Sequence, residues 1–208
     1  MHDKMFSQTG WYTRFEKWMM AACLNLLFLI SCLPLVTLGP ALATLTKLAG
    51  QVGDIGSFSN LFLAYIQEFS YFLTKRYLLS NLPFVAFGVI LLGGFYLAFQ
   101  VSSGFLMVII LALLCSTILY FAAAIPRYLW KMVQGQKMEL RQLVAEVAGD
   151  VHVSIRLAAM NVGLSLLASL SFMVWPVLST LWVIIGFYLW ASANQKILKG
   201  GSHAVFVN

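Results

Sequence analysis

The sequence has very little charge. Only 10% of its 208 residues are Asp, Glu, Lys or Arg, whereas 61% are hydrophobic. Soluble domains carry about 25% charged residues, and a chain of this size has too little interior to hide such an apolar excess. The composition therefore excludes an ordinary soluble domain and indicates that much of the surface faces lipid.

Residues that mark common reaction or metal sites are also missing. Cys23, Cys32 and Cys115 lie in apolar stretches without CxxC spacing, so neither a disulfide framework nor a zinc site is indicated, and we expect buried thiols. The sequence has no Walker A loop, HExxH, GxSxG or EF-hand loop, and its three histidines stand far apart. We predict that the protein is not an enzyme and holds no cofactor or metal.

The net charge of +6 does not indicate nucleic-acid binding. The basic residues are spread over short connectors between apolar runs and form no basic domain. We therefore expect lipid and protein partners, and no nucleic acid.

Three long stretches contain no Asp, Glu, Lys or Arg, namely 18–46, 77–126 and 157–195. A spanning helix needs about 20 residues, so we predict a helical hairpin over 77–126 and another over 157–195. The expected turns lie near 100–104 and at Trp175–Pro176.

The first stretch is too short for two full spans. Pro34 and the Gly39–Pro40 pair interrupt it, because proline removes a backbone donor and disfavours helix in the residue before it. Within a broken hairpin over 18–49, we predict one helix to about Val36. A short return segment from Pro40 then re-enters the membrane or packs inside the bundle. The expected fold is an all-α polytopic membrane protein with about five membrane helices.

The connectors contain all the charge. If each stretch turns back on itself, the N-terminus (1–17), the two connectors and the tail (196–208) share one side, which then carries all 13 Lys and Arg residues. The positive-inside rule predicts that this side, with both termini, is cytoplasmic.

Two connectors have the apolar spacing of amphipathic helices, one over 57–76 and one over 127–156. The first presents an aromatic face that suits either a membrane surface or another subunit. Its candidate partner-binding residues are Phe58, Phe62, Tyr65, Phe69 and Phe72.

The predicted spans contain few polar groups. Ion-coupled carriers usually embed ionisable side chains in their spans, and these stretches have none; Asn25 and Asn161 are their strongest polar residues. We expect each asparagine to hydrogen-bond across helices, a structural role worth on the order of 1 kcal/mol.

The N-terminal run resembles the opening signature of the YesL-like family of bacterial membrane proteins. The matching residues are Asn25-Leu26-Leu27, Leu33-Pro34-Leu35-Val36-Thr37-Leu38-Gly39-Pro40-Ala41, Ala43 and Leu45. Weaker similarity continues through Phe62 to Phe69, Pro126, Gly186 and Asn194, while Leu42 and Gln67-Glu68 depart from the family pattern. The candidate structural signature consists of Asn25, Pro34, Thr37, Gly39 and Pro40.

The resemblance implies a place in the bacterial cytoplasmic membrane and an association with binding-protein-dependent carbohydrate uptake. The chain lacks the EAA-type loop by which permease subunits engage their ATPase. Our hypothesis is therefore a non-enzymatic accessory or regulatory subunit that contacts the permease of a carbohydrate ABC transporter. The alternative is an independent small-solute channel or carrier that works as a homo-oligomer.

Overall fold

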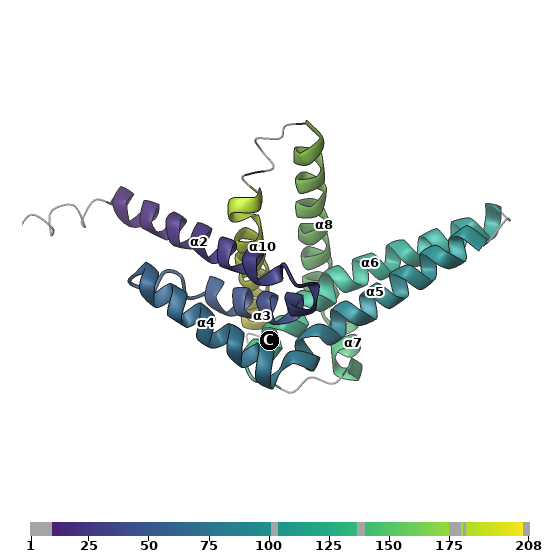
Figure 1. Cartoon of the computed structure of the whole chain (residues 1–208). Coiled ribbons are helices and arrows are strands. Elements are labelled where there is room, and N and C mark those ends of the chain that lie inside the picture. Colours follow the sequence, from purple (N-terminus) through teal and green to yellow (C-terminus); the bar gives the residue numbers. More distant parts are fainter. Residues whose placement is uncertain (1–9, 101–103, 137–139, 175–179, 181, 206–208) are drawn as a thin grey trace, which may run out of the picture.

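The computed structural model describes residues 10–100, 104–136, 140–174, 180 and 182–205. Within these ranges the regular structure is entirely helical (Figure 1), as predicted. The elements are α2 (Gly10–Cys32), the 3₁₀ turn η1 (Leu35–Thr37), α3 (Leu38–Ala49), α4 (Phe58–Lys75), α5 (Tyr77–Gln100), α6 (Gly104–Val133), α7 (Leu140–Gly149), α8 (Val151–Val174), the π-helical turn η2 (Trp182–Gly186) and α10 (Phe187–Val205).

Four of the described helices are long and apolar enough to cross a membrane. They cover Trp11–Cys32, Ser80–Gln100, Gly104–Val133 and Val151–Ser171. The chain is thus compatible with a multi-pass membrane protein. The predicted fifth span, the second arm of the last hairpin, falls partly on residues 175–179 and 181, outside the described residues.

Helix α3 lies at the centre of the molecule. Its 12 residues extend about 18 Å, too short to cross the hydrocarbon layer. It packs against α2, α4, α5, α6 and α10, and every residue from Gly39 to Thr46 is buried. The predicted return segment is therefore packed inside the bundle.

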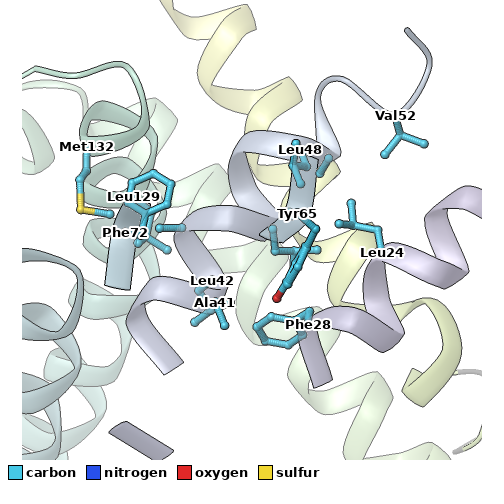
Figure 2. Close-up of a cluster of buried hydrophobic side chains, with 14 of the residues drawn as sticks. Leu24, Phe28, Ala41, Leu42, Leu48, Val52, Tyr65, Phe72, Leu129 and Met132 are labelled. Carbon is cyan, nitrogen blue, oxygen red and sulfur yellow. The ribbon is translucent and has the colours of Figure 1, made fainter. Parts of the chain in front are cut away.

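The hydrophobic core surrounds α3 (Figure 2). Side chains from α2, α3, α4 and α6 meet there, among them Leu24, Phe28, Ala41, Leu42, Leu48, Tyr65, Phe72, Leu129 and Met132. Each large apolar side chain that is fully buried contributes about 1.5–3 kcal/mol relative to exposure. These contacts hold the ends of the spans together.

Beyond this core the spans diverge (Figure 1). α5 and α6 run side by side away from the rest of the chain, while α8 and α2 project in two other directions. In the most apolar window of α5 no residue is buried, and in that of α6 only 6% are buried. Most of the surface of these spans is therefore not covered by the rest of the described chain. Cys115 on α6 is accordingly exposed, contrary to the expected burial, whereas Cys23 and Cys32 are partly buried.

The predicted helix break at Gly39–Pro40 is misplaced. α2 ends at Cys32 and the chain turns through Leu35–Thr37, so that both residues lie in the first turn of α3. Proline is tolerated there because the first amides of a helix have no intrahelical acceptor.

The predicted connector helix over 127–156 is also wrong in extent. α6 continues through Pro126 to Val133, α7 occupies only Leu140–Gly149, and α8 already begins at Val151. Likewise α2 begins at Gly10, before the predicted start of the first membrane segment. The 57–76 segment agrees more closely, since α4 covers Phe58–Lys75.

Candidate functional site

The signature segment forms a hydrogen-bonded turn between α2 and α3. The Thr37 hydroxyl lies within hydrogen-bonding distance of the carbonyl oxygens of Ser31 and Pro34, which ties the end of α2 to η1. Pro34 itself is exposed, while Pro40 is fully buried and its carbonyl accepts a bond of 2.9 Å from the Thr44 hydroxyl.

Asn81 at the start of α5 caps this turn. Thr37 makes no side-chain cap at the start of α3; instead the Gly39 amide donates to Asn81 Oδ1 at 3.0 Å, and Asn81 Nδ2 donates to the Val36 carbonyl at 3.1 Å. A side chain can in this way satisfy a helix-terminal donor that lacks an intrahelical partner. A Cβ atom at Gly39 would overlap the carbonyl oxygen of Ser80. The signature is therefore a site of close backbone packing.

Asn25 connects α2 to α10. Its side chain is fully buried, and its Oδ1 accepts a 2.9 Å hydrogen bond from the backbone amide of Tyr188. Tyr188 lies just after the π-helical turn η2, at the start of α10. The Asn25 side chain thus holds α10 at the place where the π-helical turn η2 is followed by α-helix.

Asn161 and Asn194 pair across α8 and α10. Asn161 Nδ2 donates to Asn194 Oδ1 at 3.1 Å, and Asn194 Nδ2 donates back to Asn161 Oδ1 at 3.3 Å. Asn161 Nδ2 also lies 2.8 Å from the Ala122 carbonyl of α6. The prediction that Asn25 and Asn161 bond across helices is confirmed.

The roles of Asn81 and Asn194 were missed. Each lies near one end of a charge-free stretch. At such a position the sequence is equally consistent with an amide side chain that is solvated at the membrane surface. The one feature of the sequence that could have identified them is the one that identified Asn25 and Asn161, namely an amide side chain among apolar residues.

The five aromatic candidates on α4 differ in burial. Tyr65 and Phe72 are only 3% and 1% exposed, Phe69 is partly buried against the core, and Phe58 and Phe62 are 45% and 48% exposed. Tyr65 and Phe72 are therefore occupied within the chain and do not offer a partner surface, because this side of α4 packs on α3.

Tyr65 has both a buried ring and a satisfied hydroxyl. The hydroxyl donates to the Ser31 side chain at 2.9 Å, which links α4 to the end of α2. Burial raises the pKa of Tyr65 above its ordinary value, since the phenolate would lose its hydration.

An outward apolar stripe lies beside the buried face of α4. Phe58, Phe62 and Ile66 are spaced by four residues and are each exposed by nearly half. Residues four apart lie on one side of a helix. We call these three residues the α4 stripe; it retains two of the predicted partner-binding residues, Phe58 and Phe62, and adds Ile66.

Charged side chains join neighbouring helices. Arg127 is buried and donates to the Ser154 hydroxyl and to the Asp150 carbonyl, the latter at 3.2 Å. Lys131 pairs with Glu146 of α7, and Lys47 of α3 pairs with Glu68 of α4 at 2.5 Å. Partly exposed ion pairs contribute at most about 1 kcal/mol each, so these pairs chiefly set orientation.

Metal-binding geometry is not found in the part of the chain that the structure describes: no group of three or more His, Cys, Asp or Glu side chains there is placed to hold an ion. Comparison with known proteins adds no relative. No protein-family model, no curated protein and no solved structure matches the chain.

Proposed function

We propose that this protein is a non-enzymatic accessory or regulatory membrane subunit that works by associating with other membrane proteins. The resemblance of its N-terminal signature suggests the permease of a bacterial carbohydrate ABC transporter as the partner. In this arrangement both termini and α4 lie on the cytoplasmic side.

The observation that carries the proposal is the α5–α6 hairpin, whose most apolar windows contain almost no buried residue. Its outer faces present large apolar side chains, including Val85, Val89 and Leu92, each at least 60% exposed. Gly88 and Gly93 on the same helix have open space where a Cβ would stand. Small residues permit close approach of helices in membranes, so α5 is suited to pack against a span of another subunit.

The α4 stripe supplies a second contact outside the spans. An amphipathic helix presents anchors at intervals of three and four residues to a partner groove. Phe58, Phe62 and Ile66 have this spacing and are exposed, whereas the opposite side of α4 carries Gln67 and Asn60.

The polar groups inside the bundle support the proposal that the protein is not an enzyme. The amides of Asn25, Asn81, Asn161 and Asn194 are each engaged with another helix or turn. Groups held in this way position helices, whereas a reaction would need an acid, base or nucleophile open to a substrate.

Affinity purification in mild detergent tests the proposal. A tagged full-length chain, expressed at its native level, is expected to recover permease and ATPase subunits of a carbohydrate transporter. Phe62→Ala removes an exposed ring of the α4 stripe, while Tyr71→Ala is a matched control, since Tyr71 is 41% exposed on the opposite side of the helix. Recovery of transporter subunits should fall with Phe62→Ala and persist with Tyr71→Ala. If the unmodified chain recovers no transporter subunit, the proposal is contradicted.

The alternative function is an independent oligomeric channel or carrier. The observation that favours it is a cavity between the predicted spans. A space of about 370 Å³ between the hairpin, α8 and α10 is lined by Asn161, Ser165 and Ser169 among aromatic side chains. Solute flux into liposomes that contain only this protein would favour the alternative, and partner recovery without flux would favour the accessory subunit.

A further inference from the structure

The two ends of α2 can be located relative to the spans α5 and α6. The 23 residues of α2 extend about 34 Å, slightly more than the hydrocarbon thickness of about 30 Å. If α2 crossed the membrane, its two ends would therefore lie at opposite surfaces. Figure 1 shows that α2 runs away from α3 in a direction different from that of the α5–α6 hairpin, so the contacts of each end have to be followed separately.

The beginning of α2 lies near the last turn of α6. Lys17 lines the same cavity as Lys199 of α10, and the Lys199 ammonium lies 5.6 Å from the centroid of the Trp130 ring. Trp130 belongs to the last turn of α6. In that turn the Met132 carbonyl accepts a hydrogen bond of 3.1 Å from Arg76, just before α5 begins. The first turns of α2 are therefore on the side of the molecule where α6 ends and α5 begins.

The end of α2 lies near the same end of α5. The turn that follows α2 is bonded to Asn81, which donates to the Val36 carbonyl at 3.1 Å and accepts from the Gly39 amide at 3.0 Å. Since α5 runs from Tyr77 to Gln100, Asn81 stands about 6 Å from its start and about 28 Å from its end. Both ends of α2 are thus held at the end of the hairpin that carries Arg76.

The side of α2 that points away from the bundle is apolar along the helix. Five residues at intervals of four and seven share this side and are each at least 46% exposed, namely Trp11, Phe15, Met19, Leu26 and Ile30. We call these five residues the α2 face. Arg14 and Lys17 lie on the other side of the helix, which further along carries the buried Leu24 and Phe28. The first turns of α2 therefore separate aromatic from basic side chains.

A phospholipid leaflet is the partner that fits the α2 face. Tryptophan favours the boundary between headgroups and hydrocarbon, and Trp11 stands at the start of the face, whereas the aliphatic Leu26 and Ile30 follow near its end. Helices with basic residues on one side and Trp, Phe or Leu on the other lie within the membrane interface. In that position Arg14 and Lys17 stay among the headgroups.

We infer that α2 is a membrane-docking helix, which inserts into the leaflet on the side of Arg76 with the α2 face against the acyl chains and does not cross to the other surface. From the predicted sidedness this is the cytoplasmic leaflet. The length of α3 agrees with the inference: α3 is too short to return across a membrane, and after a helix that does not cross, no return is needed. The inference concerns lipid contact and does not depend on the proposed transporter partner.

The first arm of the test asks whether α2 crosses. In the full-length chain with its three cysteines replaced by alanine, Lys75→Cys and Gln100→Cys mark the two surfaces. Leu33→Cys reports on the end of α2, since Leu33 is 80% exposed. A membrane-impermeant maleimide is applied to intact cells and to inverted vesicles.

Leu33→Cys should stay unlabelled from the side that labels Gln100→Cys. Labelling of Leu33→Cys from that side overturns the inference, because the end of α2 would then have reached the other surface. Labelling of Lys75→Cys and Gln100→Cys from one side also overturns it, because α5 would then not separate the two surfaces.

The second arm asks what covers the α2 face. In the same cysteine-free chain, nitroxide labels are placed at Phe15→Cys and Ile30→Cys of the face, with Arg14→Cys as the matched control. All three side chains are exposed, so the labels do not disturb the core. Collisions of each label with oxygen and with a water-soluble nickel chelate are measured by electron paramagnetic resonance in phospholipid nanodiscs.

The ratio of oxygen to nickel collisions should be severalfold higher at Phe15→Cys and Ile30→Cys than at Arg14→Cys, because oxygen enters hydrocarbon and a polar chelate is excluded from it. Equal ratios at the three positions overturn the inference, since the α2 face would then be in water. Shielding of Phe15→Cys and Ile30→Cys from both reagents also overturns it, because a protein and not lipid would then cover the face.

Discussion

Gly39 lies where the backbone of α3 closely approaches that of α5. A side chain there would overlap the Ser80 carbonyl, and the surrounding backbone is held by the Asn81 cap. We expect Gly39→Leu to lower the free energy of unfolding by about 1–3 kcal/mol or to prevent folding, as overpacking does. Thermal unfolding in detergent measures this. Gly163→Leu is the control, because no atom lies within 4 Å of its Cβ position; equal stability of the two variants would show that Gly39 is not packed as described.

The buried hydroxyl of Tyr65 allows a prediction of how the stability of the protein changes at alkaline pH. Its folded-state pKa is raised above the ordinary value of 10.0, so above that pH the unfolded chain releases a proton that the folded chain retains. The titration of Tyr65 therefore leaves the free energy of unfolding unchanged below about pH 10 and lowers it as the pH rises further. In Tyr65→Phe this decline should be smaller, whereas Tyr12→Phe, at an exposed position, should leave it unchanged. Unfolding temperatures at pH 9 and pH 11 provide the comparison, and identical slopes in all three proteins would contradict it.

At the scale of elements, paired amides hold α8 against α10. A double-mutant cycle with Asn161→Leu and Asn194→Leu should give a coupling energy of about 0.6 kcal/mol and at most about 2 kcal/mol, the range for hydrogen bonds between membrane helices. The same cycle on Asn25 and Asn194, which share no hydrogen bond, should give a coupling near zero. Reversible unfolding in detergent supplies the four free energies, and a null result for the first pair would remove its structural role.

The two sides of α4 should respond differently to truncation. Phe72 is 1% exposed, so Phe72→Ala should cost about 3–5 kcal/mol of stability through the cavity it leaves. Phe62 is 48% exposed, and Phe62→Ala should have a small effect on the purified protein. Equal destabilisation by both substitutions, measured by thermal unfolding, would mean that α4 is rotated relative to the described packing.

At the scale of the whole molecule, the charge distribution predicts orientation. In a chain whose three cysteines are replaced by alanine, Lys75→Cys should react with a membrane-impermeant maleimide only from the cytoplasmic side, and Gln100→Cys only from the outside. Lys75 is the last residue of α4, just before α5 begins at Tyr77, and Gln100 is the last residue of α5. Labelling in intact cells and in inverted vesicles measures both, and labelling of both residues from one side would rule out α5 as a span.

Much of the architecture is predictable because it depends on one-dimensional signals. Charge-free stretches of sufficient length predict the spans of α5, α6 and α8 without any knowledge of packing, since lipid tolerates few ionised groups. Helix ends are less predictable: α6 continues past Pro126 because its last turns pack against α7 and α8, a contact that local sequence does not encode.

The sequence by itself determined the class of protein, the approximate positions of its apolar helices, the structural roles of Asn25 and Asn161, and the periodicity of α4. These follow from transfer of side chains between water and lipid and from helical repeat, both local properties. Only the tertiary structure decided that α3 is the buried centre, that Asn81 caps it, and that Tyr65 and Phe72 face inward. Each of these depends on contacts between segments distant in the chain, and several helical arrangements satisfy the same periodic pattern until the packing of α3 selects one.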